Sequence, residues 1–341
     1  MAGGIAPPRN VIYVDRKNSE IPLAGIANLP YTDVIFSFLY PDENFNLRLA
    51  GPVFDDNLAI NIQTLQNAGK NVLISFGGAL NTKDPNDLLA QAYLYWGGQG
   101  GNNISGLVTQ IVNIVVQYGF DGVDIDYEDN RGFMGTYDGV AFLSQLTSGL
   151  YNQLPGRIIT HAPQVAYWDG SGDEFQWATN PIAPYAKLWQ QVGNYITWFN
   201  NQFYNTRRYD ENAATKVEWY SSIVALTGDI EPGPPIADPP TSGPQRLLMG
   251  VLLSAEGGGE GVESLPDMVQ NVITPLQQEY PPNPAFPGVQ FGGVMAWQFA
   301  FDQDGTWASG IWQALAGPAS TPLPLPPTSV LGKTAPGTST T

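Results

Sequence analysis

Cysteine is absent from this sequence of 341 residues, and histidine occurs only once, as His161. Without a thiol the chain can form no disulfide bond, no cysteine nucleophile and no thiolate metal site. A single histidine also excludes a metal site built from several histidines and argues against a Ser–His catalytic pair. We therefore expect a structural role for His161, and no metal and no other cofactor.

Charged residues are scarce as well, at 13% of the sequence, and the net charge is −17. A chain of this sign repels nucleic acid and anionic lipid, so we expect neither as a partner. No apolar run of 18 residues indicates a membrane span. The start, MAGGIAPPRN, is not a signal peptide. Low lysine content and loops rich in Gly, Asn and Pro nevertheless favour an extracellular protein, and we expect a monomer.

Short apolar runs rich in β-branched and aromatic residues alternate along the chain with helical patterns. The runs predict strands at 10–15, 33–40, 71–76, 122–127, 157–162, 195–204, 246–253 and 292–297. Helices are predicted at 57–70, 104–119, 139–154, 265–278 and 305–317. This alternation predicts an α/β fold, a (β/α)8 TIM barrel in a single domain over residues 10–316. The rival, a doubly wound open sheet, lacks a G-x-G-x-x-G after the first strand.

Two segments flank the predicted barrel. Residues 1–9 would form an N-terminal arm. Residues 317–341 are rich in Pro, Ser and Thr and nearly uncharged, which predicts a linker or a disordered C-terminal tail.

The stretch GFDGVDIDYED, residues 119–129, places five acidic residues within nine positions of a strand-like apolar frame. Side chains alternate along a strand, so Asp124, Asp126 and Glu128 point to one face of the sheet. The residues between them, such as Ile125 and Tyr127, point to the other face, towards covering helices. The three carboxyl groups must therefore face the barrel axis.

Neighbouring carboxyl groups in a poorly hydrated interior cannot all ionise, so at least one pKa rises and a proton is shared. A carboxylic acid with a raised pKa at the C-terminal end of a barrel strand is suited to general acid catalysis. The alternatives are an oxygen-ligand Mg²⁺ or Ca²⁺ site and an ion-pair network. Basic residues are scarce at the other strand ends, which argues against ion pairing.

Four motifs, in the right order along the chain and on the right strands, resemble glycoside hydrolase family 18, the chitinases and their relatives. DGVDIDYE at 121–128 is similar to the family's D-G-x-D-x-D-x-E motif, and SFGG at 75–78 resembles its S-x-G-G on the third strand. QFYN at 202–205 resembles the sixth-strand motif of the plant-type, single-domain members, and GGVMAWQF at 292–299 resembles the eighth-strand segment. The resemblance covers residues 10–316.

The resemblance implies a role for each of five residues. Glu128 would protonate the glycosidic oxygen and later activate water. The substrate's own acetamide would be the nucleophile, with Asp126 orienting it and Asp124 sharing a proton with Asp126. Tyr204 would donate its hydroxyl to the acetamide carbonyl, and Trp297 would form an apolar floor under the sugar.

Further substrate-binding or supporting residues follow from the same resemblance. Ser75 and Gly77 would support Asp124, and Tyr13 and Phe38 match aromatic residues at strand ends. The remaining lining residues would be Gln202, Asn205, Gln164, Met295 and Gln298. The resemblance also implies cis peptide bonds at Ser37–Phe38 and Trp297–Gln298. The proline-rich loop at 229–244 is expected above the site.

The function that these observations favour is that of an endo-acting chitinase with a retaining, substrate-assisted mechanism, acting on chitin or N-acetylglucosamine oligosaccharides. An endo-β-N-acetylglucosaminidase that cuts the chitobiose core of N-glycans would use the same motif. A lectin or an inhibitor on an inactive scaffold is the third reading. Such proteins typically lack the acid, whereas Glu128 is present.

Overall fold

The computed structural model describes residues 8–81, 83–98, 103–172, 175–236, 243–282 and 289–316. The tail predicted at 317–341 and most of the arm predicted at 1–9 lie outside the described residues.

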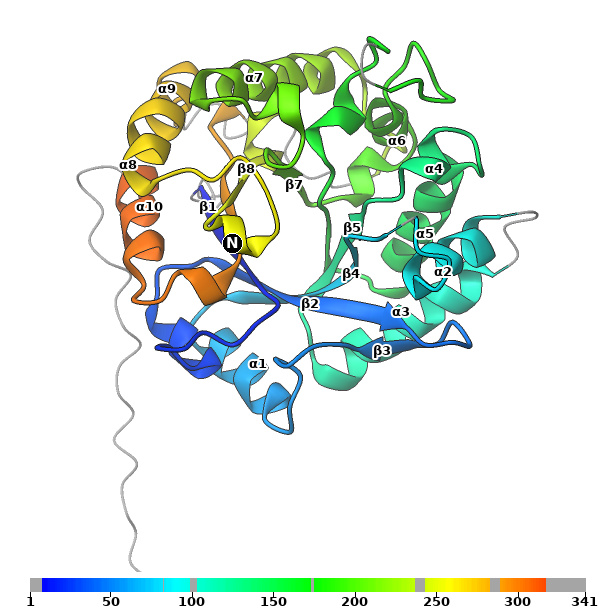
Figure 1. Cartoon of the computed structure of the whole chain (residues 1–341), viewed down its shortest axis with the longest axis horizontal. Coiled ribbons are helices and arrows are strands. Elements are labelled where there is room, and N and C mark those ends of the chain that lie inside the picture. Colours follow the sequence, from blue (N-terminus) through cyan, green and yellow to red (C-terminus); the bar gives the residue numbers. More distant parts are fainter. Residues whose placement is uncertain are drawn as a thin grey trace, which may run out of the picture.

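Eight parallel strands in this part of the chain form a closed barrel, which confirms the predicted fold (Figure 1). The first strand, β1, pairs with both β2 and β9 and so closes the ring. A short strand, β3 (Leu47–Leu49), is added to β2 in the antiparallel sense. The barrel strands are β1 (Arg9–Val14), β2 (Asp33–Pro41), β4 (Asn71–Gly78), β5 (Gly122–Tyr127), β6 (Ile158–His161), β7 (Trp198–Gln202), β8 (Leu247–Leu252) and β9 (Gly293–Trp297).

Helices surround the strands in an outer ring (Figure 1). All five predicted helical segments contain helices, and α2, α4, α6 and α7 are additional to them. Among the described residues, no helix has the length and apolar character needed to cross a membrane. The helices are α1 (Leu58–Asn67), α2 (Leu88–Gly97), α3 (Ile104–Tyr118), α4 (Asn130–Phe133), α5 (Gly139–Gln153), α6 (Pro184–Val192), α7 (Ala213–Asp229), α8 (Leu265–Asp267), the π-helical η7 (Met268–Ile273), α9 (Thr274–Glu279) and α10 (Thr306–Ala316).

Helix α3 shows how the sequence builds the outer ring. Its buried residues recur at helical spacing, so one apolar stripe packs against the sheet. The helix ends at Gly119, which adopts the left-handed conformation with φ of 76°. Glycine adopts this conformation without steric cost, and so stops the helix just before β5. The buried residues of the stripe are Ile104, Leu107, Val108, Ile111 and Val115.

Strand alternation divides the core into two layers. Outward-facing side chains pack under the helices in a large cluster that includes Val123, Ile125 and Tyr127. Inward-facing side chains fill the barrel itself and include Leu73, Trp198 and other fully buried residues. The interior is therefore a packed core, and chemistry is confined to the C-terminal mouth of the barrel.

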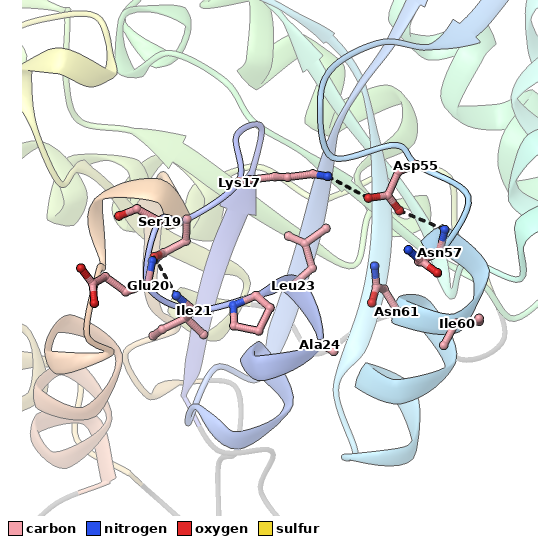
Figure 2. Close-up of a pocket in the computed structure, with 12 residues that line it drawn as sticks. Lys17, Ser19, Glu20, Ile21, Leu23, Ala24, Asp55, Asn57, Ile60 and Asn61 are labelled. Carbon is pink, nitrogen blue, oxygen red and sulfur yellow. Dashed lines mark hydrogen bonds and ion pairs between the residues drawn. The ribbon is translucent and has the colours of Figure 1, made fainter.

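The outer ring is thinnest between β1 and β2, where a single 3₁₀ turn, η1 (Leu23–Asn28), stands in place of a helix. A surface hollow of about 490 Å³ lies beside this turn, between η1 and the start of α1 (Figure 2). An ion pair of 2.8 Å joins Lys17 and Asp55 at this hollow (Figure 2). None of the predicted site residues lines it.

The position predicted for the proline-rich loop at 229–244 is wrong. Its described parts, residues 229–236 and 243–244, follow the end of α7 and precede β8, so they lie at the N-terminal end of the barrel. Two of its carbonyl oxygens accept hydrogen bonds: Ile230 O from Trp189 Nε1 at 2.7 Å, and Pro232 O from Asn194 Nδ2 at 3.0 Å. Asn194 precedes β7, at the end opposite the carboxyl groups.

Candidate active site

Strand β5 carries the acidic series into the barrel, as the alternation predicts. Asp124 and Asp126 are buried on the inner face, and Glu128 follows the last strand residue at the mouth, where it is partly exposed. Tyr127 is fully buried in the outer layer. The three carboxyl groups thus form a column that rises from the interior to the rim.

Four donors surround the lowest carboxyl group, Asp124. Its Oδ2 accepts from the hydroxyls of Tyr13 and Ser75, each at 2.8 Å. Its Oδ1 accepts from Thr160 Oγ1 at 2.6 Å and from Asn200 Nδ2 at 3.2 Å. Burial raises the pKa of Asp124, and these hydrogen bonds oppose that rise. Both oxygens of Asp124 are therefore occupied by groups that donate, which fixes the orientation of the carboxylate.

The upper two carboxyl groups form a hydrogen-bonded pair. Asp126 and Glu128 are hydrogen-bonded to each other, and Gln202 Nε2 donates to Asp126 Oδ1 at 2.8 Å and to Glu128 Oε1 at 3.4 Å. Gln164 Nε2 donates to Glu128 Oε2 at 3.1 Å. Burial, followed by the charges of Glu128 and Asp124, holds the pKa of Asp126 well above its usual value. Burial also raises the pKa of Glu128, and its hydrogen bonds oppose the rise.

Asp126 interacts with both of its neighbours in the column. It is hydrogen-bonded to Glu128, and the charge of Asp124 contributes to its raised pKa. Two donors occupy each oxygen of Asp124. The sharing of a proton between Asp124 and Asp126 stays a prediction.

Aromatic rings flank the carboxyl groups at the mouth. Phe38 stacks on Trp297 with ring centroids 5.7 Å apart and planes 27° apart, and Tyr13 lies 5.7 Å from the same indole. Trp297 keeps part of its surface exposed. The peptide bonds at Ser37–Phe38 and Trp297–Gln298 are cis, as predicted. Apolar ring surface is thus presented beside a column of acids, an arrangement suited to a sugar ring.

Tyr204 lies just beyond β7, 7% exposed, and packs against the inner core. Burial raises the pKa of its hydroxyl well above the usual value, and the charges of Asp126, Glu128 and Asp124 add to the rise. The hydroxyl therefore remains protonated and able to donate a hydrogen bond near the carboxyl groups.

Comparison with known proteins identifies the family. A model of glycosyl hydrolases family 18 matches residues 9–229, which is more than half of the chain. The chain belongs to glycosyl hydrolases family 18.

Several relatives support this assignment. Endochitinase 37 of Trichoderma harzianum is 26% identical over 253 residues, which cover 71% of this chain and 66% of that protein. The crystal structure of a family 18 chitinase from Pseudoalteromonas aurantia has a TM-score of 0.72 at 30% identity and covers 90% of this chain and 99% of that chain.

A more distant structure shows the fold alone. A xylanase and α-amylase inhibitor protein from Scadoxus multiflorus has a TM-score of 0.56 at 17% identity, covering 90% of this chain and 98% of that chain. The chain spans only part of the length of the first three curated relatives that it matches, from 38% to 66% of each relative.

Four predicted residues of this family 18 chain lie beside the site without facing the carboxyl groups. Met295 is buried in the inner core beneath Trp297, and Gln298 Oε1 accepts from the backbone N of Arg16 at 3.1 Å. Gly77 is required by close packing, since a Cβ there would lie 2.0 Å from Asp126 O and its φ is 118°. Asn205 is exposed, and its side chain bonds the loop after β8.

Two residues that hold Asp124 were not predicted. Thr160 and Asn200 lie on β6 and β7, the strands that follow β5 around the barrel. Both have the inward parity, because Ile158 on β6 and Trp198 on β7 pack in the inner core at the same parity. Their register beside Asp124 could have been found by extending the alternation from one strand to its neighbours.

His161 has the structural role that was predicted. It lies between the sheet and the helices, where its ring nitrogens contact Thr147 Oγ1 at 3.0 Å and Tyr185 Oη at 3.2 Å. Burial lowers its pKa to about 3. Within the described ranges no group of three or more His, Asp or Glu side chains is arranged to hold a metal ion.

Proposed function

We propose that the chain is an endo-acting chitinase that hydrolyses β-1,4 bonds between N-acetylglucosamine units with net retention, by a substrate-assisted mechanism. The observation that carries the proposal is the column of Asp124, Asp126 and Glu128 at the barrel mouth, in which burial and neighbouring charges hold the pKa of Asp126 well above its usual value. The names of the relatives, endochitinases and chitinases, support chitin as the substrate class.

The proton path follows from the hydrogen bonds. Glu128 receives the proton of Asp126 and passes it to the glycosidic oxygen, which makes the departing sugar a good leaving group. Asp126 is then left as an anion beside the cationic intermediate. Gln164 and Gln202 each donate to Glu128, so both hold its carboxyl group in place through the transfer. Glu128 later accepts a proton from the water that opens the intermediate.

The nucleophile in this proposal is the substrate's own acetamide group. Ordinary retaining glycosidases use a second carboxylate, but substrate assistance is a recognised exception. Asp126 is protonated and Asp124 is saturated with donors, so neither is a free nucleophile. Tyr204 donates to the acetamide oxygen and Asp126 accepts from its nitrogen, which orients the group for attack on the anomeric carbon. Trp297 supports the sugar ring.

Internal cleavage requires a groove into which a chain can enter from the side. Only residues 253–264 separate β8 from α8, too few to form an additional domain over the mouth. We propose that chitin or its oligosaccharides lie across this mouth, with no nucleic acid or membrane partner. We also propose that the protein works as an extracellular monomer.

The experiment that tests the proposal compares the chain with its Glu128→Gln variant on chitin hexamer and on a high-mannose glycopeptide. We expect mixed dimer, trimer and tetramer early in the reaction, with the β-anomer formed first in proton NMR. The variant should lose roughly 10²–10⁴-fold in turnover while still binding the oligomer.

Three results would contradict parts of this proposal. Appearance of the α-anomer first would exclude retention. Release of the glycan with chitin oligomers untouched would favour the endo-β-N-acetylglucosaminidase. Binding without any cleavage by the unaltered chain would favour a lectin.

A further inference from the structure

The loop that follows β8, residues 254–263, lies over the barrel mouth as a closed, glycine-rich loop (yellow in Figure 1). Its two ends meet, because Leu252 and Val262 form a parallel bridge. Lys216, fully buried on α7, fastens the far end through an ion pair of 2.7 Å with Glu263 and a hydrogen bond of 3.0 Å to Gly261 O. The base of the glycine-rich loop is thus firmly held.

The tip of the loop is a short 3₁₀ turn, η6 (Ala255–Gly257). Inside the loop, Gly257 N donates to Ser254 O at 2.9 Å, and Gly258 N and Gly259 N donate to Ala255 O at 3.1 and 3.2 Å. Residues 257–259 are three consecutive glycines, which have more backbone freedom to lose than any other residue. Contacts from outside the loop therefore add to these hydrogen bonds in holding its conformation.

Asn205 supplies these contacts. Its Oδ1 accepts from Glu260 N at 2.8 Å, its Nδ2 donates to Gly258 O at 3.3 Å, and its backbone N donates to Glu260 O at 3.3 Å. The fit is close, since a Cβ at Gly259 would lie 1.6 Å from Asn205 Oδ1. Asn205 has a φ of 58°, a conformation that asparagine tolerates better than most residues.

The held loop touches both sides of the site. Trp297 Nε1 donates to Gly257 O at 3.0 Å, which fixes the rotation of the indole that would lie under the sugar. A Cβ at Gly261 would lie 3.2 Å from the Cα of Tyr204. The loop therefore connects the residue that would bind the acetamide with the residue that would support the ring.

We propose that Asn205 is a positioning residue for catalysis: it holds the glycine-rich loop so that the Gly257 carbonyl sets the plane of the Trp297 indole. Asn205 itself does not touch the substrate. The inference rests on the proposed function, because it assumes that Trp297 supports the reacting sugar. A displacement of about 1 Å in such a support can cost up to 10²-fold in rate, although the chemical groups are intact.

The test uses Asn205→Gly, which keeps the backbone conformation at φ of 58° without strain and removes both side-chain hydrogen bonds. The matched control is Asn212→Ala. Asn212 is also an exposed asparagine whose Oδ1 accepts from a backbone N, that of Thr215, but it caps α7 and does not contact the loop. Both variants lose local hydrogen bonds, and only the first releases Trp297.

Two measurements are made on each variant. With 5-fluorotryptophan incorporated, the ¹⁹F resonance of Trp297 is assigned from Trp297→Phe, and it should shift or broaden in Asn205→Gly and stay unchanged in Asn212→Ala. On chitin hexamer, kcat should fall about tenfold in Asn205→Gly with a smaller change in KM, because ring support matters most in the transition state. Asn205→Asp retains the acceptor for Glu260 N but loses the donor to Gly258 O. Its kcat should therefore lie between that of the unaltered protein and that of Asn205→Gly.

An unchanged Trp297 resonance in Asn205→Gly would overturn the inference, as would an equal loss of kcat in Asn212→Ala. Failure of the proposed function is a separate result. If the unaltered chain does not cleave chitin hexamer while the resonance still shifts, the positioning contact stands and the substrate assignment falls.

Discussion

Replacing Asp126 by Asn should make the protein more stable at neutral pH and nearly inactive. Asn can reproduce the hydrogen bonds of Asp126, because its Oδ1 can accept from Gln202 Nε2 and its Nδ2 can donate to Glu128. The substitution removes only the titratable proton. It leaves no anion to face the cationic intermediate, so kcat should fall by roughly 10²-fold or more.

The gain in stability follows from the raised pKa of Asp126. Above about pH 4 the unfolded chain loses this proton while the folded protein keeps it. The folded state of the unaltered protein is therefore favoured at low pH, and this contribution is lost as the pH rises through the folded-state pKa. Each pH unit in this window costs about 1.4 kcal/mol in the free energy of unfolding. The variant does not titrate at this position and avoids the loss.

The assay is urea denaturation at a series of pH values, followed by circular dichroism. The difference in unfolding free energy between Asp126→Asn and the unaltered protein should be flat below about pH 4 and rise above it. Asp124→Asn is the matched control. Its new NH₂ group must face either Tyr13 and Ser75 or Thr160 and Asn200, so the variant should lose about 1–3 kcal/mol below about pH 4. Because the pKa of Asp124 is raised less than that of Asp126, its difference from the unaltered protein should rise less steeply above that pH. Parallel pH curves for Asp126→Asn and the unaltered protein would refute the raised pKa.

Three further predictions concern single residues. Tyr204→Phe should lower kcat/KM on chitin oligomers by about 10–100-fold, because one hydroxyl donor to the acetamide is lost; unchanged kinetics would remove Tyr204 from the mechanism. Lys216→Met leaves Glu263 without its buried partner and should lower the unfolding free energy by about 3–5 kcal/mol in urea titrations; a loss below 1 kcal/mol would contradict the anchoring role. His161 has a pKa of about 3, so its burial lowers stability as pH falls from about 6.5. His161→Gln should show a shallower acid decline, and an identical decline would show that His161 is charged in the folded protein.

The sequence predicts the barrel well because strand alternation and helix periodicity are local properties of the chain. The same alternation predicts that Asp124, Asp126 and Glu128 share a face, and β5 confirms it. The predicted strand at 195–204 is longer than β7, which ends at Gln202. Tyr204 and Asn205 therefore lie in a turn, where side-chain directions no longer follow a period of two.

Partners that come from distant segments could not be predicted from one stretch of sequence. The four donors to Asp124 come from four different strands, β1, β4, β6 and β7. They fill both of its oxygens, and no local pattern shows this. Likewise, the proline-rich loop at 229–244 was misplaced because the end of the barrel at which a loop lies depends on whether a strand or a helix precedes it. Helix α7, which ends at Asp229, precedes this loop, and that helix was not predicted from the sequence.

The pairing of β1 with β9 has a consequence for synthesis of the protein on the ribosome. Arg9 lies opposite Gly293 and Ile12 opposite Ala296. One edge of β1 therefore stays unpaired until β9, near the end of the barrel sequence, has been synthesised. At about 5–20 residues per second this interval is on the order of 15–60 s. The same late strand carries Trp297. The acidic strand β5 is therefore made well before the barrel can close, and the enclosure that raises the carboxyl pKa values is complete only after translation of β9.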